Sequence, residues 1–299
     1  MEKLIININQ LNNDIKNNAE NYIKLCEENY IGQMEKIVES VKMDNQIKFI
    51  RLTGPSSSGK TTTANLLAEK LIENEYHAKV ISLDDFFVDR EKTPLWENGD
   101  YNYETADAID WQLFDECINN LLTKGGSKMP TYNFYTGTHT FDKILTLHEK
   151  DIIIIEGLHS LNPIMDNFIK SNLCLKVYLA PFVDYVLDDK VVLNSIEMRF
   201  FRRLIRDVYT RGTSPEETLL IWNKVMLGEK LYIDPFKDTA NFTINTAHPY
   251  EICIYKYIID ELKLNENKSF EEKLNQLKDI ARLNKKYCPA NSLLQEFVH

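Results

Sequence analysis

From about residue 47 onward, short apolar runs that favour strands alternate with longer stretches of helical periodicity. The runs predicted to be strands read IKFIRL, KVISLD, DIIIIEG and LCLKVYLA. The spacing of apolar residues predicts helices over 60–76, 107–124, from about 195, and over 249–263. This alternation indicates a mostly parallel sheet covered on both faces, and the unbroken isoleucine run in DIIIIEG is typical of its central strand.

The regions that flank these runs differ from them in pattern. KMPTYNF and THTFDKILTL both carry turn residues, and the second alternates in polarity, so together they predict an inserted hairpin. Apolar residues recur at helical spacing before the first strand, which predicts one or two amphipathic helices that pack on the main domain or mediate self-association. KLNENKS is typical of a polar linker, FEEKLNQLKDIARL of a last helix, and CPANSLLQEFVH of a tail. The predicted organisation is a helical extension (1–46), a main domain (47–263), and a C-terminal helix and tail (264–299).

Composition narrows the class of protein. Hydrophobic residues at 43% and charged residues at 27% are ordinary for a soluble globular chain. The net charge of −10 argues against general nucleic-acid binding, which relies on a basic surface. The five cysteines are scattered and fit a reducing compartment. MEKLIININQ lacks the apolar core of a signal peptide, and no apolar run approaches membrane-spanning length. We therefore expect a cytoplasmic protein that binds neither nucleic acid nor membranes.

The stretch GPSSSGKTT matches G-x-x-x-x-G-K-[ST] between a predicted strand and a predicted helix, the context in which this pattern binds phosphate. Small residues leave backbone N–H groups free to wrap a phosphate chain, and the helix adds the positive end of its dipole. Lys60 is expected to reach the β- and γ-phosphates, and the Thr61 hydroxyl to ligate Mg²⁺; a serine-rich connecting loop is the alternative. The predicted ligand is a nucleoside triphosphate, bound by Gly54, Pro55, Ser56, Ser57, Ser58, Gly59, Lys60, Thr61 and Thr62.

Two carboxylates follow predicted strands, and a kinase needs a base for its acceptor and an acid for its metal. In ISLDDFF the strand ends at Leu83, which puts Asp84 and Asp85 at its carboxyl end, where ligands bind in open α/β sheets. Asp84 is predicted to take the acceptor proton or to hold Mg²⁺ through water, and an exposed acidic turn is the alternative. Glu156 ends DIIIIEG in the same way and is the predicted metal-side acid, with a helix-capping carboxylate as the alternative.

The run EMRFFRRLIRDVYTRG supplies the cations that phosphoryl transfer requires. On a helix, four of its arginines fall within an arc of about 100°: Arg199, Arg202, Arg203 and Arg206. An anionic ligand would relieve their mutual repulsion, and a solvated basic face is the alternative. Arg211 follows near a predicted loop, which suits a lid that closes over phosphates and excludes water.

Together these residues resemble the uridine kinase / phosphoribulokinase family, most closely a bacterial subgroup of uridine kinase-like nucleoside kinases. The resemblance runs from about residue 48 to 257 through GPSSSGKTT, ISLDDFFVDREKTP, IIIEGLHSLNP and RRLIRDVYTRGTSPEETL, and NSLLQEF in the tail adds to it. It implies a P-loop NTPase fold: a three-layer α/β/α sandwich with a mostly parallel sheet, a small inserted β-hairpin and a helical lid. It also implies that Asp84 acts as general base on a 5′-hydroxyl and that Glu156 lies near magnesium. The residues that would hold triphosphate and acceptor are Arg203, Arg206 and Arg211.

The acceptor side departs from the family. Typical uridine kinases read N-F-D-H-P where this chain has NYETA, so Glu104 stands where an Asp grips the ribose diol. In YNFYTG, Gly137 replaces the His that reads the base. We expect Tyr103, Tyr132 and Phe134 to pack around the nucleoside, with looser discrimination among bases. The alternative is that Glu104 caps the helix that follows and that YNFY is a hydrophobic hairpin.

We therefore expect a kinase that uses ATP and Mg²⁺ to phosphorylate the 5′-hydroxyl of a small-molecule nucleoside, uridine or cytidine. A kinase of another small hydroxyl compound, such as a sugar phosphate or a pantothenate-like molecule, is the second interpretation. The third is a nucleotide-binding regulatory protein with weak catalysis, and the intact Lys60, Asp84 and Glu156 weigh against it. The sequence leaves homo-oligomerisation open.

Overall fold

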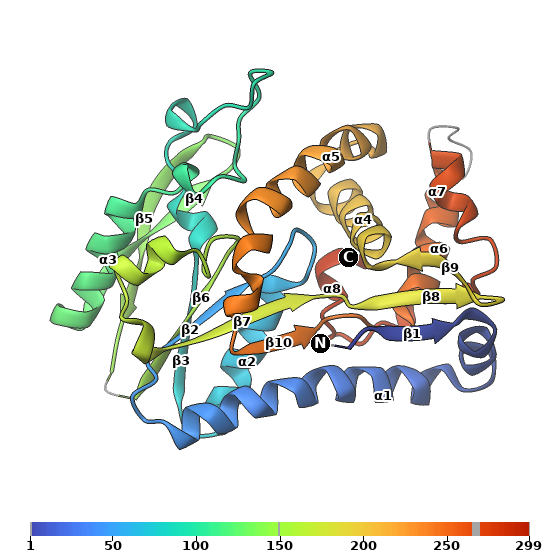
Figure 1. The fold of residues 1–299 in the computed structure, drawn as a ribbon, viewed down its shortest axis with the longest axis horizontal. Helices are drawn as coiled ribbons and strands as arrows, with labels where there is room; N and C mark the ends of the chain where they lie inside the picture. Colours follow the sequence, from blue (N-terminus) through green and yellow to red (C-terminus); the bar gives the residue numbers. More distant parts are fainter. Residues whose placement is uncertain (1, 149, 265–269, 299) are drawn as a thin grey trace.

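In the computed structural model, which describes residues 2–148, 150–264 and 270–298, five strands form a central sheet in the order β10-β7-β2-β6-β3 (Figure 1). All the strand pairs in this sheet are parallel. Leu52 and Ser82 both pair with Glu156, so three strands end together at one edge of the sheet. The strands are β2 (Phe49–Thr53), β3 (His77–Ser82), β6 (Asp151–Glu156), β7 (Cys174–Ala180) and β10 (Phe242–Asn245).

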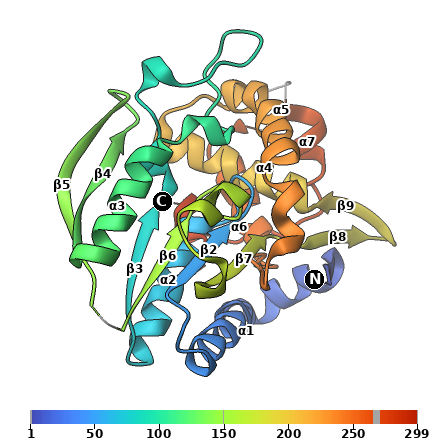
Figure 2. The same cartoon turned by 60° about the vertical axis from the view of Figure 1, so that its left-hand side comes forward.

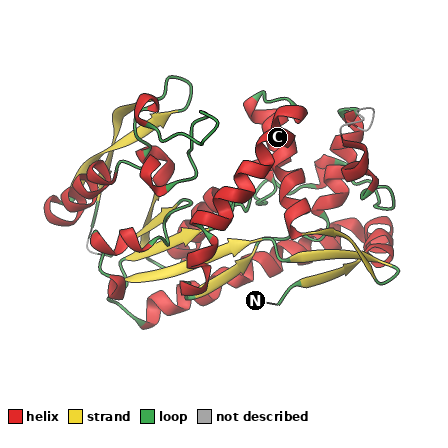
Figure 3. Cartoon of the chain, turned by 45° about the horizontal axis from the view of Figure 1, so that its top comes forward, coloured by secondary structure: helices red, strands yellow, loops and turns green. Residues whose placement is uncertain are grey.

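Helices cover both faces of this sheet. Alternate residues of each strand point to opposite sides, and apolar side chains on both sides must be buried. Ile152 and Ile154 belong to one hydrophobic cluster, and Ile153 and Ile155 belong to another. Every residue of β6 is buried, as its unbroken apolar run predicts. Figure 3 shows the helices on either side of the strands, and the predicted α/β/α sandwich is confirmed. The first cluster includes side chains of α1 (Ile8–Met43), α2 (Lys60–Glu73), α4 (Ser195–Arg206) and α6 (Glu251–Glu261), and the second includes those of α3 (Trp111–Lys124).

The predicted hairpin is present. It consists of β4 (Gly126–Asn133) and β5 (Thr138–Thr146), which pair antiparallel. Figure 2 shows the hairpin beside α3, at the margin of the central sheet. Short 3₁₀ helices lie in the loops along the chain: η1 (Leu83–Phe86), η2 (Arg90–Lys92), η3 (Ala106–Ala108), η4 (Pro163–Asn167), η5 (Ser171–Leu173), η7 (Asp234–Thr239) and η10 (Lys285–Tyr287).

A second sheet was not predicted. In it β1 (Leu4–Asn7) pairs in parallel with β8 (Val183–Leu187), which pairs antiparallel with β9 (Lys190–Asn194). The N-terminal region therefore begins with a strand, and one long helix follows, interrupted by non-helical backbone at Asn18. With only four residues, LIIN, β1 is too short to show the alternation of apolar and polar positions that would mark it as a strand.

The helix predicted from about residue 195 is α4, which starts at a capping box formed by Asn194 and Glu197. It runs into a π-helical turn, Asp207–Arg211, and the chain reverses at Gly212, whose φ is +62°. α5 (Pro215–Tyr232) follows. Within the described ranges, no helix has the length and apolar character needed to cross a membrane.

The C-terminal region differs from its prediction. In place of one helix over 270–283, α7 (Glu271–Asn275) is followed by turns and later by α8 (Gln295–Val298). Of the predicted linker, residues 265–269 lie outside the described residues. The tail packs inward instead of lying on the surface, and three of its side chains have no exposed area: Leu293, Leu294 and Phe297.

Candidate active site

The glycine-rich stretch, residues 54–61 (the phosphate loop), connects β2 to α2 at the edge where the parallel strands end. Gly59 has a φ of +87° and caps α2 without a side chain. A side chain at Gly54 would collide with the carbonyl oxygen of Leu179, and one at Gly59 would collide with Leu293. Both glycines of the motif are therefore required by close packing, and the N-terminus of α2 stays open to an anion.

Lys60 is the first residue of α2, and its ammonium group donates a hydrogen bond to the Pro55 carbonyl at 3.2 Å. Burial lowers the pKa of Lys60, and the charges of Glu156 and Asp84 oppose that shift. The fold thus brings together a lysine and two carboxylates from three separate segments of the chain.

Glu156 forms a small polar cluster at the end of β6. Its Oε1 accepts hydrogen bonds from Ser82 Oγ at 2.6 Å and from Thr61 Oγ1 at 3.3 Å. Burial raises the pKa of Glu156 to about 7, and the charge of Asp84 adds to the shift. Ser82 was missed from the sequence, although its position at the end of the strand before the two aspartates was a usable signal.

The neighbouring Asp84 and Asp85 face different partners. Burial raises the pKa of Asp84, whereas the charge of Lys60 lowers it. Asp85 instead accepts a hydrogen bond at 3.3 Å from the backbone N–H of Tyr132 in the hairpin. Of the two aspartates, Asp84 is therefore the one on the side of the phosphate loop.

The side chains of Thr61, Asp84 and Glu156 offer a hydroxyl and two carboxylates, the oxygen ligands that Mg²⁺ prefers. The described residues contain no group of three or more His, Cys, Asp or Glu side chains that could hold a metal ion. A Mg²⁺ ion bound with a nucleotide takes most of its ligands from phosphates and water, so this donor set fits it. The raised pKa values of Asp84 and Glu156 also show two carboxylates that a nearby cation would stabilise.

Three arginines, two at the end of α4 and one at the end of the π-helical turn, gather round the buried carboxylate of Asp207. Its oxygens lie 3.2 Å from Arg203 Nε, 3.9 Å from Arg206 Nε and 3.2 Å from Arg211 Nη1. Arg203 also donates a 2.8 Å hydrogen bond to Ser56 Oγ in the phosphate loop. Burial lowers the pKa of Arg206 to about 10, and the neighbouring charge of Arg211 adds to the shift. Asp207 was missed from the sequence, although it stands as an acid within a basic run.

The prediction that four arginines of α4 share one ligand-facing surface is wrong. Arg199 is buried and pairs with Glu229 of α5 at 2.6 Å. Arg202 is buried and pairs with Glu251 of α6 at 2.7 Å, and it also donates to the Ser57 carbonyl at 3.3 Å. Because α4 packs against other helices, protein carboxylates relieve most of the repulsion that seemed to require a ligand. The other two arginines lie beside the phosphate loop.

Glu104 lies partly buried between the phosphate loop and α5. Burial raises its pKa to about 7, and the charges of Arg203 and Lys60 oppose that shift. Gly228 of α5 packs directly on it, since a Cβ there would approach Glu104 Cβ to 2.6 Å. The helices that follow are capped by Thr105 and Asp110, so the alternative that Glu104 is a helix cap is wrong.

Aromatic rings from three segments meet around Phe87. Its ring centroid lies 5.2 Å from that of Tyr103, 5.8 Å from that of Tyr132 and 5.9 Å from that of Phe134. Tyr132 is buried, whereas Phe134 is 57% exposed. The three predicted aromatic residues are therefore neighbours. Phe87 was missed, although it stands in the same ISLDDFF motif as the aspartates.

Arg90 occupies the space beside Gly137. The glycine has a φ of +75°, and a Cβ there would approach Arg90 Cβ to 2.6 Å. The Arg90 guanidinium donates hydrogen bonds to the backbone carbonyls of Tyr135, at 3.4 Å, and of Phe134. This end of the aromatic cluster thus presents a cation beside the glycine.

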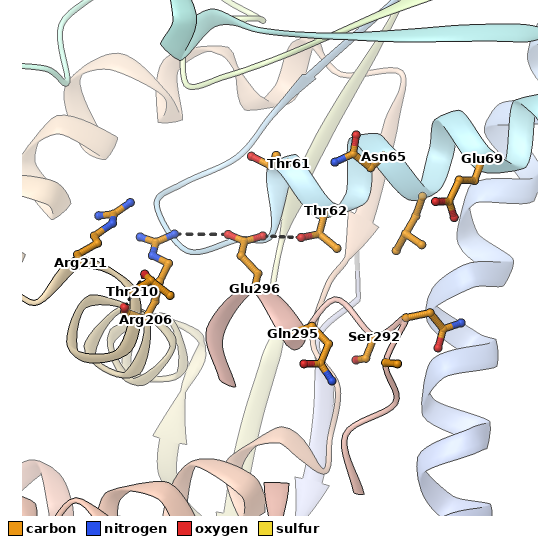
Figure 4. Close-up of a pocket in the computed structure, with 13 residues that line it drawn as sticks. Thr61, Thr62, Asn65, Glu69, Arg206, Thr210, Arg211, Ser292, Gln295 and Glu296 are labelled. Atoms are coloured by element: carbon orange, nitrogen blue, oxygen red, sulfur yellow. Dashed lines mark hydrogen bonds and ion pairs between the residues drawn. The ribbon is translucent and has the colours of Figure 1, made fainter. Parts of the chain in front are cut away.

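A cavity of about 690 Å³ opens beside the phosphate loop, between α2, the end of α4 and the C-terminal tail, residues 288–298 (Figure 4). Glu296 of the tail joins two of these walls. Its carboxylate accepts hydrogen bonds from Thr62 Oγ1 at 2.8 Å and from Arg206 Nη1 at 3.4 Å. Neither the cavity nor the tail's part in it was predicted, because NSLLQEF carries no pattern that specifies a contact.

Comparison with known proteins shows which family the chain resembles. The model of the Phosphoribulokinase / Uridine kinase family matches residues 49–252. The uridine kinase of Lactobacillus helveticus is 31% identical over 227 residues, which cover 75% of this chain and 93% of that protein. Uridine-cytidine kinase B of Dictyostelium discoideum is 29% identical over 231 residues, 76% of this chain and 87% of that protein. A solved structure of a possible uridine kinase from Bacillus stearothermophilus covers 71% of this chain and 97% of its own, with 19% identity and a TM-score of 0.48.

Proposed function

Since the chain belongs to the phosphoribulokinase / uridine kinase family, we propose that it transfers the γ-phosphoryl group of ATP to the 5′-hydroxyl of uridine or cytidine. It is an ATP-dependent phosphotransferase with an alcohol acceptor. The nucleoside acceptor is supported mainly by one arrangement: Glu104, partly buried near the charge of Asp84, lies between the phosphate loop and the aromatic cluster around Phe87. A ribose and a base, joined in that order, match a carboxylate followed by aromatic rings.

The triphosphate would lie in the phosphate loop, with its γ-phosphate toward Lys60. Charge on the phosphoryl group is spread over its oxygens during transfer, so cations fixed beside it lower the barrier. Lys60, Arg206 and Arg211 are the cations proposed for this role, and Arg203 would hold the phosphate loop through Ser56. Asp207 keeps the three arginines together before any phosphate arrives.

Asp84 is the proposed general base. As the 5′-oxygen bonds to the γ-phosphorus, its proton passes to the Asp84 carboxylate, and the bond from that phosphorus to the β–γ bridging oxygen breaks to release ADP. Burial raises the pKa of Asp84, and a carboxylate of raised pKa is a stronger base. Thr61, Glu156 and Asp84 would hold Mg²⁺, directly or through water. When bound, the ion supplies positive charge to the phosphate oxygens.

Glu104 would accept hydrogen bonds from the 2′- and 3′-hydroxyls of the ribose. One carboxylate can accept both, so a missing hydroxyl would leave a partly buried carboxylate oxygen without its partner, at a cost of roughly 1–3 kcal/mol. Tyr103, Tyr132 and Phe134 would pack around the nucleoside, as the sequence predicts. With Arg90 beside Gly137, we expect a base with a carbonyl oxygen to be accepted with limited discrimination between uracil and cytosine.

Release of ADP from ATP, measured with a panel of acceptors, tests this function. We expect turnover with uridine and cytidine, and kcat/KM about 10- to 100-fold lower with deoxyuridine. A sugar phosphate and pantothenate belong in the panel, because activity with either one alone would replace the nucleoside by another acceptor. Slow ADP release that is the same with and without every acceptor would instead favour a weakly catalytic nucleotide-binding protein.

A further inference from the structure

The C-terminal tail contributes to the site although it lies outside the residues that match the family model, 49–252. Leu293 packs against Gly59 of the phosphate loop so closely that a Cβ on this glycine would collide with it. The Phe297 ring lies 5.2 Å from the guanidinium carbon of Arg202, which itself donates to the Ser57 carbonyl. The tail is therefore built into the back of the phosphate loop.

The N-terminal helix holds the tail in this place. Ser292 Oγ donates a 2.7 Å hydrogen bond to Glu27 of α1, and the Tyr250 hydroxyl donates to the same carboxylate oxygen. Burial would raise the pKa of Glu27, but hydrogen bonds from His248, Ser292 and Tyr250 outweigh it and lower the pKa. These hydrogen bonds hold the tail in place as one wall of the cavity.

The two ends of the cavity differ in charge, as Figure 4 shows. Arg206 and Arg211 lie at one end of it, and Asn65 and Glu69 line the other. From Thr61 to Glu69 the cavity follows α2 for eight residues, about 12 Å at the helical rise. Phosphates favour the cationic end, and a neutral group about as long as a nucleoside fits the end with the amide and the carboxylate.

We propose that the nucleoside part of ATP binds in this cavity and that the C-terminal tail forms the wall that contacts its base. This inference rests on the proposed use of ATP as donor, and it adds the tail to the donor site. Asn65 of α2 and Asn291 of the tail both line the cavity with exposed side-chain amides, which can donate to and accept from the edge of a purine. Leu66 and Ala290 supply apolar contact for its faces.

Calorimetric titration of Asn65→Ala and Asn291→Ala with Mg²⁺-ATP and with Mg²⁺-tripolyphosphate tests the assignment. Each substitution should weaken ATP about 3- to 10-fold, the effect of one lost neutral hydrogen bond, and should leave tripolyphosphate unchanged. Asn172→Ala is the matched control, because Asn172 is exposed in η5, away from the residues that line the cavity. Equal weakening of both ligands would mean that the cavity holds phosphates, and no weakening of either would remove the tail from the site.

The titrations need no acceptor, so failure to phosphorylate uridine would not affect them. A wild-type chain that binds tripolyphosphate as tightly as ATP would overturn the assignment while leaving the phosphate loop and the kinase function in place. Photolabelling with 8-azido-ATP supplies a second readout, since cleavage after Lys286 by trypsin places the tail in one peptide, residues 287–299. We expect label in that peptide that excess ATP removes, and label confined to other peptides would contradict the proposal.

Discussion

Thr62 Oγ1 donates a 2.8 Å hydrogen bond to the carboxylate of Glu296, 234 positions later in the chain. One helical position further on, Thr63 Oγ1 lies 2.7 Å from the Tyr30 hydroxyl of α1. The first turn of α2 is therefore braced from both ends of the chain, by segments that flank the residues matched by the family model. The groups proposed to bind phosphate and the groups that support them can thus be tested separately.

Lys60→Ala should slow phosphoryl transfer strongly and leave the fold intact. Loss of one cation at the transferring phosphoryl group costs about 3–4 kcal/mol of transition-state stabilisation, or roughly 10²- to 10³-fold in kcat. Burial lowers the pKa of Lys60, which means that keeping this side chain charged in the folded state costs stability. Its removal should therefore leave the fold intact. Steady-state kinetics and a circular-dichroism melt measure both effects. Lys70→Ala, on the same helix, is the control and should keep the wild-type rate; an unfolded Lys60→Ala would contradict the prediction.

Asp84→Asn should bind Mg²⁺-ATP but transfer its phosphoryl group about 10²- to 10⁴-fold more slowly, because an amide cannot take the acceptor proton. Asp85→Asn is the matched substitution one residue away, and it should keep most of the rate since an amide oxygen can still accept from Tyr132 N–H. ATP titration separates binding from turnover. If Asp85→Asn were the slower of the two, the base would be misassigned.

Glu104→Gln should stabilise the protein in a pH-dependent way. The folded-state pKa of Glu104 is raised from 4.5 to about 7, so its contribution to stability is present below pH 4.5 and is lost as the pH rises through 7. Wild type and variant should therefore be equally stable near pH 4.5, and the variant more stable at pH 8 by on the order of 1–3 kcal/mol. Urea unfolding at both pH values measures this. Glu97→Gln, at an exposed site, should show no such difference, and a Glu104→Gln variant less stable than wild type at pH 8 would contradict the expected sign.

Asp207→Asn should lower Tm, because it leaves three arginines close together without their shared carboxylate, and breaking a buried ion pair typically costs about 3–5 kcal/mol. ATP should then raise the Tm of the variant more than that of wild type, since phosphates would replace the missing negative charge. Thermal shift with and without Mg²⁺-ATP measures both. A smaller ATP effect in the variant would show that Asp207 serves only the fold.

The order of strands and helices could be predicted because β6 is apolar on both faces and the phosphate loop follows a strand. The meeting of Lys60, Asp84 and Glu156 followed from the same logic, since parallel strands end at one edge. Glu104 and the aromatic residues depended on the family resemblance, because nothing in NYETA specifies which long-range partner it meets. Their burial and grouping are visible in the structure, while their roles stay predictions.

The rest could not be predicted for physical reasons. Helical spacing places four arginines within one arc of α4. It says nothing about the carboxylates that other helices bring to Arg199 and Arg202. The sequence of the tail gives no sign that the tail is buried, because Leu293 and Phe297 contact segments more than 90 residues away. In both cases tertiary contacts decide what local pattern leaves open.

The hydrogen bond between Glu27 and Ser292 spans 265 positions, which has a consequence for synthesis of the chain on the ribosome. A nascent chain that has emerged through α6 already holds the phosphate loop, Asp84 and Glu156, yet it lacks the wall that Leu293 and Phe297 complete. Until the tail arrives, the groove that receives it exposes apolar surface. Because such late, long-range contacts form slowly, folding intermediates with this groove open should be the species that chaperones bind and that aggregate at high concentration.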